Sequence, residues 1–249
     1  MDTGLDTDLA SALEEIIDSR YSTRGFREEH LDEDTVERLF RMAQRAPSWC
    51  NVQPWRVYLL SDAARTDLSE RLMAARERED AYEIPAPTRF EGVFRDRRRE
   101  VGFGLYNSLG IERDDIEARR AQAWQNHRFF GAPHVAVITS SRQIGPYGYV
   151  DTGLYVAHLL LAARALGLGS IAQAAIAARS DVVRPALGIP DDEEIVTAVS
   201  FGYEDTTHPA NAFRSARAPL ADAIQHVEAL HQEQDAPPDA PGPGPAPRA

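Results

Sequence analysis

The loop between a predicted helix and a predicted strand reads Ala46-Pro47-Ser48-Trp49-Cys50-Asn51-Val52-Gln53-Pro54-Trp55. Its two prolines restrict the backbone, and its hydroxyl and amide side chains can form hydrogen bonds. Polar loops held between rigid elements commonly present such groups to a ligand. Pro47-Ser48 could equally be no more than the stop signal of the preceding helix, so this loop alone leaves both interpretations open.

Another polar segment lies upstream of this loop, so that it is the first polar segment of the chain and the loop 46–55 is the second. It reads Arg20-Tyr21-Ser22-Thr23-Arg24-Gly25-Phe26. It places two guanidinium groups and the hydroxyls of Ser22 and Thr23 within five residues, which suits a phosphate or another polar anion. Arg20 and Arg24 could also be ordinary surface charges, so the first polar segment is as ambiguous as the second when it is taken alone.

The spacing of apolar residues outlines the elements around these segments. Asp62 is expected to cap a charged helix, and the stretch 83–91, with its prolines, is expected to be a loop. Helices are expected over 9–20, 33–46, 62–80, 94–108, 113–127, 150–166 and 220–232, and strands over 55–60, 135–139, 171–173 and 195–201.

The segment 150–166 is apolar on nearly every side. A helix at the surface shows an apolar stripe, whereas a helix that is apolar all round is buried all round. In a chain of 249 residues this pattern predicts a central helix with one face against a second subunit. We therefore expect a homodimer.

The stretch Gly167-Leu168-Gly169-Ser170-Ile171-Ala172 matches the dinucleotide-binding pattern G-x-G-x-x-A. That pattern belongs between a strand and the start of a helix, whereas these glycines follow a long predicted helix. We interpret Gly167 as a left-handed residue that ends this helix, and we predict no Rossmann domain.

The composition excludes several kinds of chemistry. All 27 basic residues are arginine, and the chain has one cysteine, Cys50. A Schiff-base enzyme and a Walker P-loop both need lysine, while disulfides, thiolate zinc sites and protein-held iron–sulfur clusters need several cysteines. The seven histidines show no metal-ligand spacing, and a net charge of −12 argues against nucleic acid as a partner.

The composition also suggests where the chain works and where it is ordered. The first twenty residues carry no long apolar run and no other stretch is long enough to cross a bilayer, so we expect no signal peptide, no membrane partner and a cytoplasmic location. Residues 1–7 and the Pro/Gly/Ala-rich tail 235–249 are expected to be disordered.

Taken together, the two polar segments resemble the nitroreductase family of flavin enzymes, and further landmarks follow in the family's order. These are Asp151 at the start of the buried helix, Leu161 to Gly169 at its end, and Phe201-Gly202-Tyr203 at the end of a later strand. Asn126 and Phe129-Phe130-Gly131-Ala132-Pro133 are similar to the nitrobenzoate-reductase-like branch. The resemblance covers about residues 9–230, which gives an expected domain over 8–232 with an insertion or lid at about 83–130.

The resemblance implies an α+β, nitroreductase-like fold: a central mixed or antiparallel sheet flanked by helices and completed by homodimerisation. It also implies FMN between the subunits and NAD(P)H as the reductant, with hydride passing through flavin N5 in ping-pong order to nitroaromatics, quinones or similar small acceptors. No side chain is expected to act as a classical catalytic group. The expected cofactor-binding residues are Arg20, Tyr21, Ser22, Arg24, Pro47, Ser48, Asn51, Asn126, Ala172, Gln173, Ala174, Ala175, Arg214 and Arg217.

The resemblance also gives these residues roles. Arg20, Ser22, Arg214 and Arg217 would hold the phosphate and ribityl chain, and Arg24 would stabilise the reduced flavin at its N1–O2 edge. Pro47, Ser48 and Asn51 would come from the partner subunit. The stretch 172–175 would lie along the ring, with main-chain donors near N5 and O4.

Residues that would set specificity are harder to assign. Four arginines in 95–99 are interpreted as a solvated face, with a substrate-carboxylate contact as the alternative, and Trp49 as a residue that narrows the site. The following residues are expected to be in the core: Cys50, Trp124, Phe129, Phe130 and, with a hydrogen-bond partner, His158.

Two other functions fit the same sequence. One is an FMN-dependent oxidase or dehydrogenase that tailors a natural product, and the other is a flavin-binding protein without turnover. The physiological acceptor and the choice between NADH and NADPH stay open at this stage.

Overall fold

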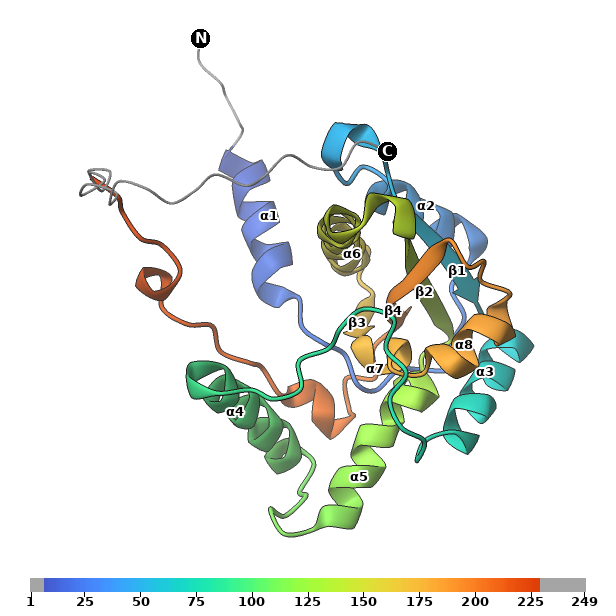
Figure 1. Ribbon diagram of the computed structural model, residues 1–249. Helices are drawn as coiled ribbons and strands as arrows, with labels where there is room; N and C mark the ends of the chain where they lie inside the picture. Colours follow the sequence, from blue (N-terminus) through green and yellow to red (C-terminus); the bar gives the residue numbers. More distant parts are fainter. Residues whose placement is uncertain (1–6, 229–249) are drawn as a thin grey trace, which may run out of the picture. The chain divides into compact units, whose positions relative to one another are not determined.

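The computed structural model describes residues 7–228, which contain a four-stranded antiparallel sheet (Figure 1). The strands are β1 (Trp55–Leu60), β2 (His134–Ser141), β3 (Gly169–Gln173) and β4 (Glu193–Gly202), in the order β1-β2-β4-β3. Thus β1 and β3 are the two edges. The predicted strands are confirmed, each within a few residues of its expected bounds.

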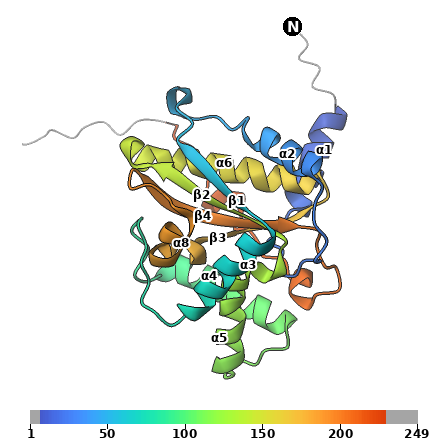
Figure 2. The same ribbon diagram turned by 90° about the vertical axis from the view of Figure 1, so that its right-hand side faces the viewer.

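Helices cover both faces of the sheet, because the central strands are apolar on both sides. On β2, Ala136 and Ile138 face one core cluster, which includes residues of α2 (Glu33–Ala43) and α6 (Pro146–Ala165). Val135 and Val137 face a second cluster, built with α3 (Asp62–Ala74), α7 (Ala174–Ala177) and α8 (Ser180–Leu187). Figure 2 shows these layers, with α6 and α2 on one side of the sheet and α3 and α8 on the other.

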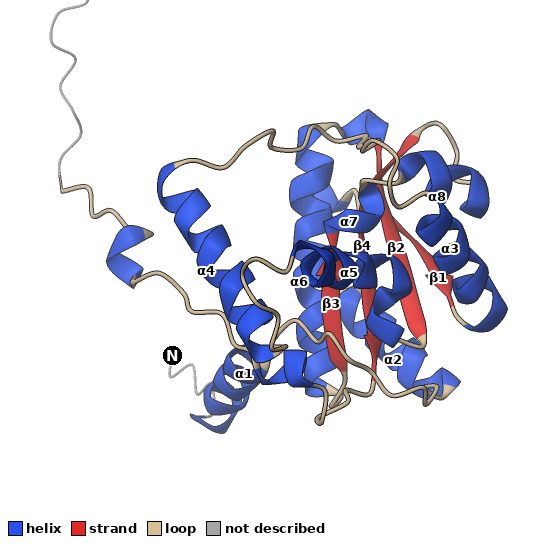
Figure 3. Ribbon diagram, turned by 90° about the horizontal axis from the view of Figure 1, so that it is seen from below, coloured by secondary structure: helices blue, strands red, loops and turns tan. Residues whose placement is uncertain are grey.

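The other helices lie outside these layers. They are α1 (Thr7–Ser19), α4 (Gly92–Ser108) and α5 (Ile116–Trp124), and Figure 3 shows α4 apart from the sheet. Short 3-10 turns complete the chain: η1 (Trp49–Asn51), η2 (Gln125–Gly131), η3 (Arg142–Ile144), η4 (Pro209–Ala212) and η5 (Leu220–Asp222).

The end of α6 confirms the interpretation of Gly167. Its φ is +74°, and its N–H bonds to the carbonyl of Arg164 while the N–H of Leu168 bonds to that of Ala163. This pair of bonds is the Schellman ending, which needs a left-handed residue. The glycines therefore end a helix and do not begin a dinucleotide-binding turn.

Three expected helices are shorter than predicted, and one of them is α5, which spans Ile116–Trp124 rather than 113–127. Ser61, rather than Asp62, occupies the N-cap position of α3, and the helix ends at Ala74 rather than near residue 80. Residues 79–81 do not continue the helix, because their main chain bonds elsewhere: Ala81 pairs with Arg179 and donates its N–H to the Ala178 carbonyl. The helix α2 ends at Ala43, three residues before its expected end.

Elsewhere, the short helix α8 was not predicted, and the helix expected over 220–232 is wrong for its described part. The contacts of the chain divide it into two units, Met1–Ser215 and Ala216–Ala249. Within the second unit the described residues form only the 3-10 turn η5, and Leu220, Ile224 and Val227 are exposed. An apolar stripe that buries nothing gives a helix little stability.

The expected disorder of residues 1–7 and 235–249 lies outside the described residues, except that Thr7 begins α1. The domain bounds 8–232 and the insertion at 83–130 stay predictions. Over residues 7–228, no helix has the length and apolar character that a membrane crossing needs.

Candidate active site

The first polar segment runs along the open edge of the sheet. Ser22 pairs with Ser170 of β3 in a parallel bridge, in which the N–H of Thr23 donates to the Ser170 carbonyl at 3.1 Å. Beyond it, Phe26 pairs with Glu204 just past the end of β4. Ser22 and Thr23 therefore lie beside the start of β3, and Phe26 lies beside the residues that follow β4.

Past Ser22, the edge of β3 is open. The Ser170 carbonyl accepts from Thr23 and therefore points away from β4. Main-chain groups two residues apart on a strand point to the same side. Ala172 therefore directs its N–H and C=O to this open side. The side chains of Ala172 and Ala174 are small and exposed. Because α7 begins at Ala174, its first N–H groups have no partner within the helix. This edge therefore offers main-chain donors to a flat ligand.

The predicted residues Gln173 and Asn126 meet beneath this edge. The buried Gln173 amide donates to the main-chain carbonyl of Asn126 at 2.9 Å, and Ser200 donates to the Gln173 side-chain oxygen. These bonds fix the start of α7 against η2.

Arg24 is a cation without a counter-ion. Its Nη1 donates to the Ser22 carbonyl at 3.1 Å, and no carboxylate of residues 7–228 forms an ion pair with it. Burial lowers the pKa of Arg24 from its ordinary value, which is a measure of how far the guanidinium is removed from water. A desolvated guanidinium beside open main-chain donors is suited to bind an anion or a group that becomes negative.

Tyr21 and Arg214 form the far side of this cluster. The Tyr21 hydroxyl donates to Glu204 at 2.6 Å, and the Arg214 guanidinium lies 3.4 Å from the centre of the Tyr21 ring. Burial, followed by the bond to Glu204, raises the pKa of Tyr21. Five of the predicted residues are thus brought to one place, namely Arg20, Tyr21, Ser22, Arg24 and Arg214. Arg217 belongs to the second unit of the chain.

The second polar segment is held at the start of α6. The main-chain N–H of Trp49 lies 3.1 and 3.2 Å from the two carboxylate oxygens of Asp151, and the Trp49 ring packs on Tyr147 at 4.9 Å. The turn also needs left-handed backbone at Cys50 and Asn51, with φ of 49° and 58°. Pro47 and Asn51 are exposed, and Ser48 accepts the N–H of Gln53.

One chain does not bring the two polar segments together. Asp151 holds the second segment near the start of α6, whereas Arg164, close to its end, donates to Ser19 beside the first segment at 2.8 Å. Thirteen helical residues separate these anchors, which corresponds to about 20 Å. Figure 2 shows α6 lengthwise, with the blue turn of residues 49–51 near one end and α1 near the other.

Comparison with known proteins identifies the family. A model of the "Nitroreductase family" matches residues 17–203. The chain belongs to the nitroreductase family.

Two curated relatives and one solved structure extend this match. The chain is 37% identical over 226 residues to "Nitroreductase NfnB" of Mycolicibacterium smegmatis, covering 90% of this chain and 96% of that protein. It is 32% identical over 231 residues to "4-nitrobenzoate reductase" of Nocardioides sp., covering 90% and 92%. The crystal structure of the "FMN-dependent nitroreductase NfnB from Mycobacterium smegmatis in complex with NADPH" superposes with a TM-score of 0.84 at 36% identity, over 89% of this chain and all of that one. The predicted family and fold are confirmed.

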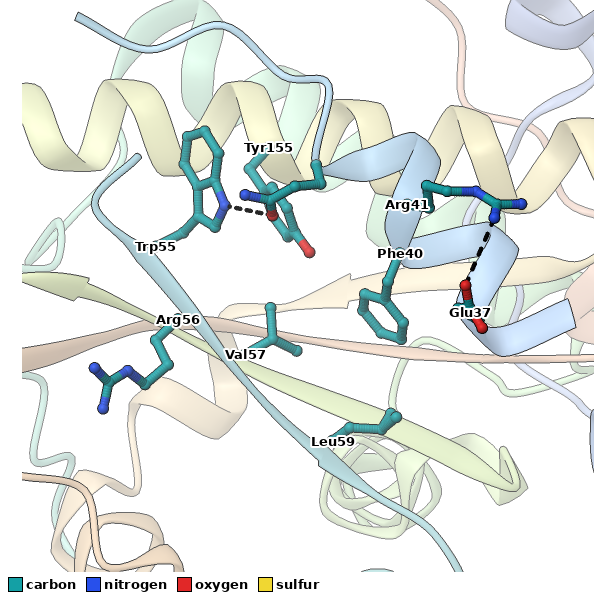
Figure 4. Close-up of a pocket in the computed structure, with 9 residues that line it drawn as sticks. Glu37, Phe40, Arg41, Trp55, Arg56, Val57, Leu59 and Tyr155 are labelled. Atoms are coloured by element: carbon teal, nitrogen blue, oxygen red, sulfur yellow. Dashed lines mark hydrogen bonds and ion pairs between the residues drawn. The ribbon is translucent and has the colours of Figure 1, made fainter. Parts of the chain in front are cut away.

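The main cavity drawn in Figure 4 is a different feature of this nitroreductase-family chain. It has a volume of about 660 Å³ and lies between α2 and the edge strand β1. Phe40, Val57 and Tyr155 line it, and the Trp55 indole donates to Gln44 at 3.1 Å across it. None of the predicted cofactor-binding residues lines this cavity.

The core and surface assignments have mixed outcomes. Phe129 and Phe130 are buried and Trp124 is half-buried under Arg76, while the four arginines within 95–99 are exposed, as expected. Cys50 is exposed, so its expected packing is wrong within one chain. His158 is only half-buried, because it lies toward the open face of α6, and its Nδ1 contacts the Leu154 carbonyl.

Two residues near the site gave no sequence signal. Asp151 was noted only as a landmark and not as the anchor of the Trp49 turn, and Asn211 was not noted at all. Asn211 is buried against Arg24 and Gly25. Each makes its contact across more than a hundred residues, and no local spacing predicts such a pairing.

Proposed function

We propose that this nitroreductase-family chain is an FMN-dependent NAD(P)H oxidoreductase that reduces nitroaromatics, quinones or similar small acceptors. The observation that carries the proposal is the desolvated, unpaired Arg24 beside the open edge of β3. Relatives that share about a third of the sequence are named nitroreductase and 4-nitrobenzoate reductase, and one was crystallised with NADPH.

The residues of this site fit FMN. Arg20, Ser22 and Arg214 supply cations and a hydroxyl for the phosphate and ribityl chain. The role expected for Arg217 stays a prediction. The small side chains of Ala172 and Ala174 are exposed, and Gln173 between them bonds to Asn126, so a flat ring could lie against the main-chain donors of this edge.

FMN, when bound there, accepts hydride from NADH or NADPH and passes the reducing equivalents to the acceptor. Arg24 would supply a positive charge to a flavin ring bound at this edge, and this charge would lower the free energy of the reduced state without any proton transfer by the protein. Arginine stays charged over the working pH range even with a lowered pKa, so this charge does not titrate.

We further propose that the functional unit is a cytoplasmic homodimer in which Pro47, Ser48 and Asn51 complete the partner's site. Two observations support this assembly. The two polar segments lie about 20 Å apart along α6, so one chain does not join them. The face of α6 next to the second segment is apolar and open, with Tyr147 60% and Val150 59% exposed. A homodimer would bury this face.

The insertion over 83–130 is proposed as a lid on the same site. Its helix α4 packs through Gly104 on Phe213, next to Arg214; a Cβ at Gly104 would lie 2.3 Å from the Phe213 ring. The glycine therefore lets the helix approach the residue beside the phosphate cluster.

The function is tested in three steps on the purified protein. FMN is titrated into apoprotein and followed by flavin fluorescence; NADPH and NADH are then mixed with the loaded protein without oxygen; finally a nitroaromatic acceptor is added. We expect stoichiometric FMN uptake, rapid bleaching and turnover well above that of free FMN. Failure to bind FMN would overturn the proposal, whereas binding without bleaching would favour the oxidase reading and bleaching without turnover a flavin carrier.

The assembly is tested by sedimentation equilibrium. We expect twice the chain mass of 27.6 kDa and one FMN per chain. A monomer that still binds FMN with full affinity would show that the Pro47–Asn51 segment is not needed from a partner.

A further inference from the structure

Asn211 is a buried amide that forms two hydrogen bonds to the loop that carries Arg24 and one to residue 205. Its side chain is 4% exposed. Its Oδ1 accepts the main-chain N–H of Arg24 at 2.7 Å, and its Nδ2 donates to the carbonyls of Gly25 and Asp205, both at 2.8 Å. One side chain thus satisfies main-chain groups on both sides of the Arg24–Gly25 peptide.

Only an amide can make this set of bonds. The position needs one acceptor and two donors, which a carboxylate, a hydroxyl or an aliphatic side chain of this size does not supply. Buried main-chain groups that lose their partner cost free energy, so the three bonds also fix the distance between the Arg24 loop and residue 205.

The turn that carries Asn211 makes a second contact with the Arg24 loop. Asn211 closes the turn by donating its N–H to the His208 carbonyl, and the His208 ring packs directly on Gly25. A Cβ at Gly25 would lie only 2.3 Å from the His208 ring, so no other residue fits there without displacing this ring. The loop is held between an imidazole and an amide.

We propose that Asn211 is a positioning residue for Arg24. Among the described residues, the guanidinium itself forms one hydrogen bond, to the Ser22 carbonyl, so its location depends on the main chain from which it extends. Electrostatic stabilisation by a fixed donor is lost when the donor is free to move, because the charge must then be reorganised during the reaction. The Asn211 side chain is buried and bonds only to main-chain groups, so we assign it a role that acts through Arg24.

The kinetic test rests on the proposed function and uses a double-mutant cycle in the FMN-loaded protein. Asn211→Ala should slow flavin reduction by NADPH about tenfold while the Kd for FMN changes by less than about threefold. In an Arg24→Ala background the same change should alter the rate by less than about twofold, because the group that it positions is gone. An equal loss in both backgrounds would overturn the proposal.

A matched control and a second variant keep this test interpretable. Thr207→Ala removes the hydroxyl bond to the Asp205 carboxylate in the same turn, keeps the main-chain bond to it and does not touch Arg24, so we expect the reduction rate to stay within about twofold of the parent. If Asn211→Ala does not fold, Asn211→Ser keeps one acceptor and one donor and should show a smaller loss with the same dependence on Arg24.

The structural test needs no flavin. Hydrogen–deuterium exchange of the apoprotein should show faster exchange in the peptide that contains residues 22–26 in Asn211→Ala, and not in Thr207→Ala. Unchanged exchange there would overturn the proposal even if the protein is a flavin enzyme. Conversely, a protein that binds no FMN but shows this exchange would overturn the proposed function alone.

Discussion

Replacing Asp151 by alanine should weaken FMN binding at the partner's site, which the altered chain completes with its Pro47–Asn51 loop. Asp151 is 4% exposed, and its carboxylate accepts the N–H of Trp49, the first residue of the turn between Ser48 and Val52. Without that acceptor the turn loses its anchor to α6, and Ser48 and Asn51 leave the positions that they hold for the partner.

The size of the effect follows from the bond that is lost. A hydrogen bond to a charged group contributes about 1.5–3 kcal/mol. The turn also holds two left-handed residues, Cys50 and Asn51, whose conformation costs free energy. A loop that has lost its anchor lowers its free energy by leaving this conformation. If the loop's proposed contribution to binding is lost in full, the Kd for FMN rises by about 10- to 150-fold. Asp151→Asn keeps an acceptor of the same size and should lose only about half of this free energy.

The assay mixes two inactive variants. In the proposed dimer, each site takes Arg24 from one chain and the Pro47–Asn51 loop from the other. In a heterodimer of Arg24→Ala and Asp151→Ala chains, one site therefore contains both altered parts and the other site contains neither. After unfolding and refolding of a 1:1 mixture, about half of the dimers are mixed, so about a quarter of the parental activity should return at limiting FMN. No recovery beyond the average of the two homodimers would refute the reasoning, because it would mean that both segments serve the same chain's site.

Three further predictions concern stability, each measured by urea unfolding. Gly167→Ala should lower the free energy of unfolding by about 1–2 kcal/mol, since a Cβ disfavours the left-handed φ of +74°, whereas the same change at Gly153, which has open space, should not. Gly25→Ala should cost about 1–3 kcal/mol through its clash with His208, and a cost near zero would show that this ring moves freely. The pKa of His134 is lowered by burial first and by His30 second, so the unfolded state binds its proton more readily, and stability should fall as pH drops below about 6.5. His134→Gln, which retains an acceptor for the Leu31 N–H, should flatten that fall; an unchanged slope would contradict the assignment.

The sequence predicted the elements that have a local period or a local stop signal. The strand 55–60 and the helix around 150–166 were found because alternation and apolar density are visible within one window, and Gly167 because a helix end has its own chemistry. The helix over 220–232 was predicted from the same kind of stripe and is wrong where it is described, because a stripe needs a surface to pack on.

The site was predictable in part for a related reason. Arg20 to Arg24 and 172–175 are compact motifs, and the structure places them side by side at the edge of the sheet. Asn211 and the anchoring role of Asp151 were missed, since their bonds to Arg24 and Trp49 join segments that only the folded chain brings together. The open face of α6 was expected as a subunit contact because the helix is apolar on nearly every side, and one chain leaves part of this apolar surface exposed.

The exposed Cys50 gives this chain an unusually simple labelling chemistry. It is the only thiol in the sequence, it is in the turn held by Asp151, and no lysine competes for reagents that attack amines. A maleimide dye would therefore mark one defined atom on the unaltered protein, and an amine-reactive dye would react at the α-amino group, in a separate step. Energy transfer between two populations labelled at Cys50 would then report subunit exchange in real time, without a single substitution.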